Sequence, residues 1–213
     1  MPRKNIISFH GRPIIAHTIE AAIGTGLFER VVVSTEDSEI AEVGSRFGAE
    51  IDARDQALAT DSASVMDVCL DFLRREEVSN RVYDVLCVLY ATAPLRNVGD
   101  IRHVVELIQP GNCDFAIAVT RYDLPPHQAL RILPDNRLEP MWPELVQARS
   151  DEIGELRVDN GSTYAVSVPA FMEHQSFYGP GLCGYEMPRE RSVDIDTHED
   201  LELVSYYAGR QKS

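Results

Sequence analysis

Apolar, strand-like segments alternate with amphipathic, helix-like segments along most of this chain, and this alternation constrains the fold more than any other feature. The apolar runs at residues 30–34 and 85–90 are typical of strands buried on both faces. Residues 14–23, 38–47 and 65–75 place apolar side chains at helical spacing. Such alternation favours a parallel sheet covered by helices on both faces. We therefore expect an α/β fold with three layers and a mostly parallel, Rossmann-like sheet. Further strands are expected at residues 49–53, 115–119 and 162–168, and a further helix at residues 100–109.

The alternation breaks at residues 122–156, which are rich in proline and polar residues. This segment holds one short strand candidate, at residues 129–133, and the single tryptophan, Trp142. A loop of this length without a function or a partner is unusual. We interpret the chain as a single domain, residues 1–213, with an excursion off the sheet at 122–156 that is a candidate oligomer contact.

Near the carboxyl end, two acidic residues alternate with two apolar residues. On a strand, Val193 and Ile195 would enter the core while Asp194 and Asp196 share the opposite face. Thr197 has the position of a helix N-cap for a helix at residues 199–210. Two carboxylates at this point suit an oxygen-ligated cation such as Mg²⁺. The alternative is two solvated acids at the mouth of a loop.

The net charge limits the class of partner. The formal charge of −14 argues against nucleic acid and anionic membranes as main partners, but a local basic site is enough for a small anionic substrate. The sequence has no run of 18 apolar residues and no visible signal peptide. Its four cysteines lack CxxC spacing, so we expect reduced thiols in a cytoplasmic protein.

Polar segments follow several of the expected strands. In a parallel sheet, ligands bind in the crevice at the carboxyl ends of the strands. Residues 34–37, 91–96 and 159–161 and the Asp194–Asp196 pair would meet there. The candidate cations for this crevice are Lys4, Arg54, Arg96 and Arg149. Basic side chains and paired carboxylates fit a polyanionic nucleotide bridged by a divalent metal.

The same segments carry a family resemblance. The motifs are PRKNI at 2–6, VVVSTED at 31–37, LATD at 58–61, YATAPLR at 90–96, NG at 160–161 and DIDT at 194–197. In this order they resemble the CMP-sialic acid synthetase (acylneuraminate cytidylyltransferase) family. The YATAP version and the WPE…ARS segment at 142–150 are most similar to its pseudaminic acid branch.

The resemblance implies a nucleotidyltransferase fold and a reaction. CTP and an acidic nine-carbon 2-keto sugar would give a CMP-sugar and pyrophosphate with Mg²⁺, as the anomeric hydroxyl attacks the α-phosphorus. It also implies a homodimer built through the excursion. The implied roles are catalysis for Lys4, Asp194 and Asp196, metal binding for Asp194 and Asp196, nucleotide binding for Lys4, Asn5, Arg54 and Ser64, and sugar binding for Tyr90, Arg149, Asn160 and Tyr164, with Arg149 a candidate contribution from the partner subunit.

Several alternatives stay open. Lys4 is also consistent with a basic terminus that has no specific role, and Arg54 with a surface ion pair. Tyr90 and Tyr164 are also consistent with aromatic residues of the core. The family's first strand and phosphate-binding loop would precede Met1, so we expect either a longer, active natural protein or a chain of doubtful catalysis. The competing functions are a 3-deoxy-octulosonate cytidylyltransferase and an inactive nucleotide- or sugar-binding homologue.

Overall fold

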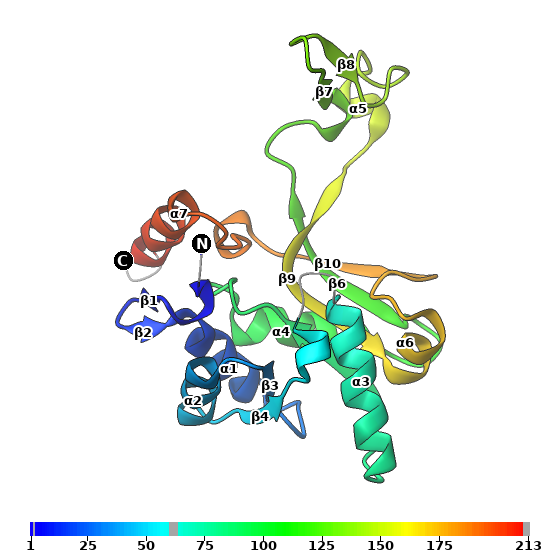
Figure 1. Cartoon of the computed structure of the whole chain (residues 1–213). Helices are drawn as coiled ribbons and strands as arrows, with labels where there is room; N and C mark the ends of the chain where they lie inside the picture. Colours follow the sequence, from blue (N-terminus) through cyan, green and yellow to red (C-terminus); the bar gives the residue numbers. More distant parts are fainter. Residues whose placement is uncertain (2, 60–63, 211–213) are drawn as a thin grey trace.

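A computed structural model describes residues 1, 3–59 and 64–210 of the chain (Figure 1). Pro2 of the first motif and Thr60 and Asp61 of the LATD motif lie outside the described residues. A sheet-and-helix body carries one long projection, the arm, which leaves the body at the end of one strand and returns at the start of another.

The main sheet has four strands in the order β10-β6-β9-β5. Its members are β5 (Val85–Leu89), β6 (Phe115–Arg121), β9 (Arg157–Ser167) and β10 (Cys183–Glu186). Strand β10 is parallel to β6, whereas β9 is antiparallel to both β6 and β5. Strands β5, β6 and β10 therefore run in one direction and β9 runs against them. The sheet is mixed: three of its four strands share one direction, and two of its three pairings are antiparallel.

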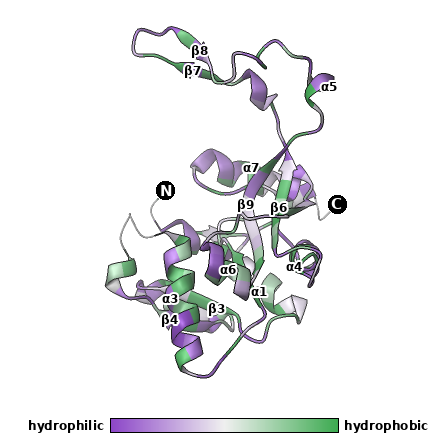
Figure 2. Ribbon diagram, turned by 90° about the vertical axis from the view of Figure 1, so that its right-hand side faces the viewer, coloured by the Kyte–Doolittle hydropathy of each residue, from purple (hydrophilic) through white to green (hydrophobic). Residues whose placement is uncertain are grey.

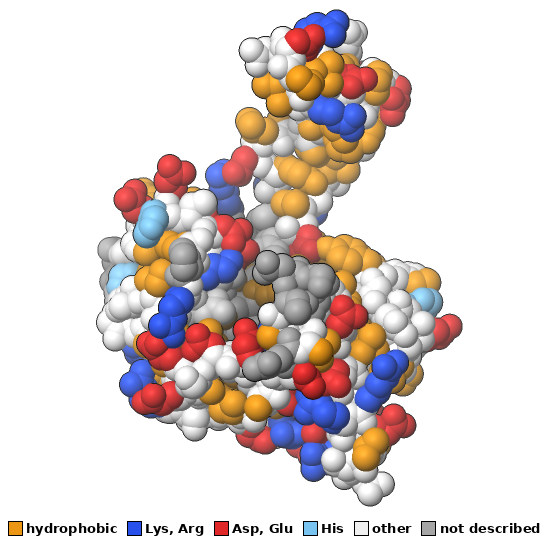
Figure 3. Space-filling model, in the orientation of Figure 1, with side chains coloured by type: hydrophobic (Ala, Val, Ile, Leu, Met, Phe, Trp, Pro, Cys, Tyr) orange, Lys and Arg blue, Asp and Glu red, His pale blue; other side chains and the backbone are white. Residues whose placement is uncertain are grey.

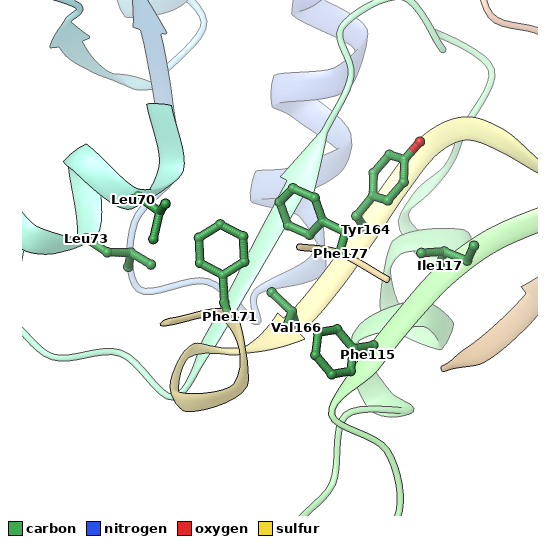
Figure 4. Close-up of a cluster of buried hydrophobic side chains, with 8 residues drawn as sticks. All are labelled: Leu70, Leu73, Phe115, Ile117, Tyr164, Val166, Phe171 and Phe177. Atoms are coloured by element: carbon green, nitrogen blue, oxygen red, sulfur yellow. The ribbon is translucent and has the colours of Figure 1, made fainter. Parts of the chain in front are cut away.

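Helices cover both faces of this sheet, which confirms the three-layer prediction. Along β6, Phe115 and Ile117 join a cluster with α3 (Val65–Val78) and α6 (Val168–His174). Their neighbours Ala116 and Ala118 face the opposite side, where Val104 of α4 (Val98–Glu106) packs. Figure 4 shows the first cluster, with Phe171 of α6 and Val166 of β9 beside Phe115. The period-two alternation of strand side chains thus feeds two separate cores.

A smaller parallel pair lies beside the main sheet. It consists of β3 (Val32–Thr35) and β4 (Glu50–Ala53), with α1 (Ile14–Thr25) and α2 (Ser38–Arg46) packed nearby. Within the described part of the chain, β3 pairs only with β4 and β5 only with β9. The parallel layer is therefore in two hydrogen-bonded pieces. The expectation of a preceding strand and loop stays a prediction.

Glu76 of α3 joins these two pieces. Its carboxylate accepts hydrogen bonds from Arg81 (2.7 Å from Nε), from Tyr83, just before β5 (2.6 Å), and from Arg30, just before β3. Arg30 also pairs with Glu50 of β4 at 2.8 Å. These hydrogen bonds hold the pKa of Glu76 well below its ordinary range, the one to Arg81 contributing most.

The predicted helices and most strands agree with the structure within a few residues. Outside residues 122–156, the sequence patterns did not predict α6, strand β10, the two-residue strands β1 (Ser8–Phe9) and β2 (Arg12–Pro13), or the first half of β9. None of the segments missed shows the long apolar periodicity on which the predictions depended. Figure 2 shows green and purple residues on the same helix, α3, as its amphipathic pattern predicts.

The excursion predicted at residues 122–156 is the arm between β6 and β9 (Figure 1). It contains the hairpin β7 (Leu130–Ile132) and β8 (Leu138–Pro140) and a short helix, α5 (Ser150–Ile153). Its exposed apolar side chains are numerous, as the orange atoms of Figure 3 show. They include Leu124, Leu130, Ile132, Leu138, Met141 and Trp142.

No described helix combines the length and the apolar character needed to cross a membrane.

Candidate functional site

The Asp194–Asp196 segment is held by its middle residue. Ile195 is fully buried against Ile14, Leu95 and Val204, and its backbone N–H donates to the carbonyl of Thr92 at 3.0 Å. The predicted strand is wrong here, because residues 192–195 lie outside every sheet ladder. The predicted alternation holds in outline, because Ile195 is buried, Asp194 is partly buried and Asp196 is exposed.

Helix α7 (His198–Arg210) fixes the end of this segment. Asp200 accepts hydrogen bonds from the Thr197 backbone (2.8 Å), the Thr197 hydroxyl (2.8 Å) and the Asp196 backbone (3.0 Å). The Thr197 hydroxyl in turn accepts from the Asp200 N–H at 3.2 Å. This reciprocal arrangement is the predicted capping box. It holds the backbone of Asp196 at the mouth of the helix.

Asp194 is a carboxylate with unused hydrogen-bonding capacity. Its Oδ1 is buried and has no hydrogen-bond partner among the described residues. Burial raises the pKa of Asp194, the charges of Asp196 and Asp200 raise it further, and Thr92 and Lys4 lower it. A buried polar atom without a partner is costly, so a ligand that completes it is favoured.

Lys4 lies against the second carboxylate. Its Nζ is 2.5 Å from Oδ1 of Asp196, a contact between residues 192 positions apart. Lys4 begins the short 3-10 helix Lys4–Ile6, which also carries Asn5. The Asn5 side chain makes no hydrogen bond within the described part of the chain and stays available for a ligand. The structure thus brings together Lys4, Asp194 and Asp196, as predicted.

Asp194 and Asp196 are the candidate ligands of this site for a divalent cation. Among the described residues, no group of three or more His, Cys, Asp or Glu side chains forms a metal cage. Mg²⁺ is usually held by one or two carboxylates together with substrate phosphates and water. Asp196 and Asp194, whose Oδ1 has no partner in the described part of the chain, fit that arrangement.

Two of the predicted sugar-binding residues meet at the edge of the main sheet. Tyr90 follows β5, and its ring meets the Tyr164 ring edge-on at a centroid distance of 5.6 Å. Tyr90 is partly exposed, whereas Tyr164 is buried. Burial, followed by the charges of Asp159 and Asp194, raises the pKa of Tyr90. The Tyr90 hydroxyl therefore lies within electrostatic reach of both carboxylates.

Asn160 has an internal role that the sequence analysis did not predict. Its Nδ2 donates to the Ser192 hydroxyl at 3.0 Å, and its Oδ1 accepts from Ser162 at 2.7 Å. These bonds connect β9 to the residues just before Asp194. Asn160 thereby positions the acidic segment, and direct sugar binding by Asn160 stays a prediction.

The predicted nucleotide-binding residues Arg54 and Ser64 lie near β3, β4 and α3. Arg54 donates to the Ser34 carbonyl at 2.6 Å and pairs with Glu36 at 3.5 Å, while its buried Nε has no partner among the described residues. Ser64 caps α3 in a capping box with Asp67. Their contact with a nucleotide stays a prediction.

Arg149 is not brought to the body. It lies on the arm at the start of α5, its side chain is 76% exposed, and it pairs with Asp151 at 3.1 Å. Within one chain, nothing places this guanidinium beside Asp194. A role for Arg149 therefore requires another copy of the chain or a large movement of the arm.

The sequence profile of a family described as "Cytidylyltransferase" matches residues 1–131. The chain belongs to the cytidylyltransferase family. It is 34% identical over 205 residues to the pseudaminic acid cytidylyltransferase of Campylobacter jejuni subsp. jejuni serotype O:2, a match that covers 96% of this chain and 88% of that protein. It is 32% identical to the CMP-N,N'-diacetyllegionaminic acid synthase of Legionella pneumophila subsp. pneumophila, with the same coverage of both chains.

Two solved structures have folds similar to that of this cytidylyltransferase. A CMP:2-keto-3-deoxy-manno-octonic acid synthetase complexed with CTP superposes with a TM-score of 0.69 at 15% identity, covering 99% of this chain and 93% of that one. A 4-diphosphocytidyl-2C-methyl-D-erythritol synthase from Anaerococcus prevotii gives 0.66 at 10% identity, covering 97% and 93%. These likenesses confirm the nucleotidyltransferase fold.

Two residues that contact the predicted sugar-binding residue Tyr164 or its neighbours were not among the predicted candidates. Asp159 accepts the phenol hydrogens of Tyr164 and of Tyr178, which follows α6. The segment 159–161 was singled out only as a polar loop, so Asp159 had a weak signal. Tyr178 had none, because a loop tyrosine without periodic neighbours has no local pattern that predicts its contacts.

Proposed function

We propose that this cytidylyltransferase activates a nine-carbon 2-keto acid sugar, of the pseudaminic, legionaminic or sialic type, with CTP to give a CMP-sugar and pyrophosphate. The observation that carries the proposal is the Asp194 carboxylate, which lies near the Lys4–Asp196 pair and has one buried oxygen with no partner among the described residues. The relatives at 32–34% identity are named for such sugars. The octonic acid synthetase is similar at only 15% identity, which favours the nine-carbon class.

In the proposed reaction, the anomeric oxygen of the sugar forms a bond to the α-phosphorus of CTP. The bond from that phosphorus to the oxygen bridging to the β-phosphorus breaks, and pyrophosphate leaves with the bonding electrons. The hydroxyl proton passes to solvent. The proposed task of the protein is to position the two substrates and to offset negative charge on the phosphates.

Three of the described residues would share these two roles. Asp194 and Asp196 would hold Mg²⁺, which when bound supplies positive charge to the phosphate oxygens. Lys4, already within 2.5 Å of Asp196, places a second positive charge beside them. Burial of Asp194 strengthens these electrostatic interactions, because charges interact more strongly away from water.

The arm supports a proposal about assembly. Its exposed apolar side chains include Ile132, which is 68% exposed, and Leu124, which is 78% exposed. Large apolar groups gathered on a projection mark an interaction site. We propose a homodimer in which the arms contact the partner and bring Arg149 towards the partner's site, where it meets the sugar carboxylate or a phosphate.

Pyrophosphate release from CTP tests the catalytic proposal. The assay uses Mg²⁺ and four separate sugars, namely pseudaminate, N,N'-diacetyllegionaminate, N-acetylneuraminate and 3-deoxy-octulosonate, with the product identified by mass. We expect turnover with at least one nine-carbon sugar and loss of turnover with EDTA, restored by excess Mg²⁺. Turnover confined to 3-deoxy-octulosonate, or binding of CTP without turnover of any sugar, contradicts the proposal.

Solution mass tests the assembly proposal. The chain mass is 23.8 kDa, so light scattering should give about twice that value for the dimer. Ile132→Glu should shift the mass to that of one chain. As a matched control, Val78→Glu alters an exposed apolar residue at the end of α3 and should leave the mass unchanged. A single-chain mass for the unchanged protein contradicts the dimer.

A further inference from the structure

Arg96 is a buried cation without an acidic partner. The sequence predicted a crevice cation at this position, but only 2% of Arg96 is exposed, so it lies inside the body. The nearby Asp100 pairs with Arg191 at 2.8 Å, and no carboxylate among the described residues forms an ion pair with Arg96. Burial lowers the pKa of Arg96 to about 10, so the guanidinium keeps its charge at neutral pH. A buried charge without a counter-charge is costly, so its retention points to a role.

The Arg96 guanidinium ties three elements together at the carboxyl end of β5. It donates to the carbonyl of Tyr90, just after β5, at 3.3 Å, and to the carbonyl of Ser162 in β9. It also donates to the hydroxyl of Thr18 in α1 at 2.8 Å. All three acceptors are neutral oxygens. The planar, forked guanidinium holds several acceptors in fixed directions, which an ammonium group does not do.

The first of these contacts closes the loop formed by residues 90–96. The chain leaves β5 at Tyr90, and the side chain of Arg96 returns to the Tyr90 carbonyl. Inside this loop, the Thr92 carbonyl accepts the N–H of Ile195 at 3.0 Å, and Leu95 packs against Ile195. Ile195 stands between the two acids of the candidate cation site. The closed loop therefore supports the acidic segment at its middle residue.

The second contact supports the same segment from β9. The Ser162 hydroxyl donates to Asn160, whose amide donates to the hydroxyl of Ser192, shortly before Asp194. The intervening residue approaches the carboxylate directly, because a Cβ atom at Gly161 would lie 3.6 Å from Oδ2 of Asp194. The guanidinium thus fixes the backbone at both places from which the acidic segment is held.

The uncancelled charge of Arg96 also suits an anionic ligand. No carboxylate in the described part of the chain neutralises it by contact, so its field reaches the surrounding backbone at Tyr90 and Ser162. A positive charge in a low-dielectric interior favours negative charge nearby. Carboxylates and phosphates would gather at the acidic segment when a metal-bound nucleotide is present.

We propose that Arg96 is a positioning residue for the binding of metal-bound CTP. It fixes both supports of the acidic segment and so holds Asp194 and Asp196 where they meet a divalent cation on the phosphates. It acts through Tyr90, Ser162 and the 90–96 loop and contacts neither the cation nor a substrate. This inference rests on the proposed function and adds to it a residue that works from inside the body.

Calorimetric titration of the full chain with CTP, without sugar, tests this role. The titration is run once with Mg²⁺ and once with EDTA, so that the metal-dependent part of the affinity is measured by itself. Arg96→Lys keeps a basic group but loses the fork. We expect its CTP affinity to fall about tenfold with Mg²⁺, the effect of one charge-assisted hydrogen bond, and by less than about threefold with EDTA. Arg102→Lys changes an exposed arginine that donates to the Thr25 carbonyl, and this matched control should change neither affinity.

A merely structural role of Arg96 predicts a different result. Arg96→Lys would then unfold at a lower denaturant concentration, while its folded fraction would gain as much CTP affinity from Mg²⁺ as the unchanged chain. That outcome overturns the inference. If Arg96→Lys does not fold, Thr18→Val decides, because it removes one acceptor of the guanidinium and should reduce the gain from Mg²⁺. An unchanged gain in Thr18→Val then overturns the inference.

The absence of sugar from this titration separates the inference from the proposed function. A chain that gains CTP affinity from Mg²⁺ but turns over no sugar contradicts the proposed function alone. If Mg²⁺ brings the unchanged chain no gain in CTP affinity, both proposals fail.

Discussion

Two carboxylates withdrawn from solvent, Glu76 and Asp194, are surrounded in opposite ways. Glu76 is 4% exposed and its oxygens accept hydrogen bonds from Arg30, Arg81 and Tyr83, which lower its pKa. Asp194 has one buried oxygen without a partner among the described residues, and burial raises its pKa. A carboxylate satisfied from within the chain joins parts of the fold. A carboxylate left unsatisfied is available to a ligand.

The two carboxylates also change the free energy of unfolding in opposite directions. A carboxyl with a lowered pKa in the folded state stabilises the fold above its unfolded pKa, whereas one with a raised pKa costs stability when ionised. Glu76 therefore stabilises the fold at neutral pH, and Asp194 opposes it. An unfavourable buried charge such as that of Asp194 is typical of sites that serve binding or catalysis rather than stability.

The largest expected effect is the loss of stability in Glu76→Gln. Removing the charge leaves Arg81 without its carboxylate and Arg30 with Glu50 alone, so the free energy of unfolding should fall by about 3 kcal/mol at pH 7. Glu77→Gln, at an exposed position of the same helix, is the control and should be nearly neutral. Denaturant titration measures both.

The pH dependence sharpens the same test. The stabilisation by Glu76 is present above its unfolded pKa and is lost as pH falls through its lowered folded pKa. The difference between Glu76→Gln and the unchanged chain should therefore shrink in strong acid. An equal loss for Glu76→Gln and Glu77→Gln would show that the buried cluster has no special role.

A smaller effect is expected at Lys4. Lys4→Met removes the ammonium that lies 2.5 Å from Asp196 and should lower kcat/KM about tenfold, the value of one charge-assisted hydrogen bond. Arg3→Met removes a neighbouring charge that pairs with Asp37 and Glu39 and should have little effect. Equal losses in the two variants would assign the effect to general charge rather than to the site.

The smallest effect is a shift in the acid limb of the pH–rate profile. Asp194 must be ionised to bind a cation, and its pKa is raised, so kcat/KM should start to fall at a higher pH than for an ordinary carboxyl. Lys4 lowers the Asp194 pKa, so Lys4→Met should move the limb further up. A limb that stays in place in Lys4→Met contradicts the assignment to Asp194.

Much of the fold could be predicted because its elements obey local periodicity. Helix α1 and strand β5 are long apolar patterns, and their bounds were predicted closely. Strand β10 was missed because Gly184 and a short length give it no alternation. The first half of β9 was missed because Asp159, Asn160 and Gly161 form a bulge, where polar residues replace the strand pattern.

The site was predictable to a lesser degree. The expected crevice at the strand ends and the family resemblance both placed Lys4 and Asp196 in one site, but neither predicted the ion pair between them. The buried oxygen of Asp194 depends on how Ile195 packs, which no spacing reveals. The internal bonds of Asn160 and the Tyr178 contact likewise arise from tertiary packing of separate segments.

The most direct test of the account is the rate of pyrophosphate release by Asp194→Asn and Glu76→Gln, measured side by side with saturating CTP, Mg²⁺ and sugar. The temperature should be about 20 °C or below, where folded domains are most stable. The account predicts that Asp194→Asn remains as stable as the unchanged chain or more so, yet loses activity by about a hundredfold or more. It predicts that the folded fraction of Glu76→Gln keeps a nearly normal rate. A nearly normal rate for Asp194→Asn would contradict the assignment of the unsatisfied carboxylate to the reaction.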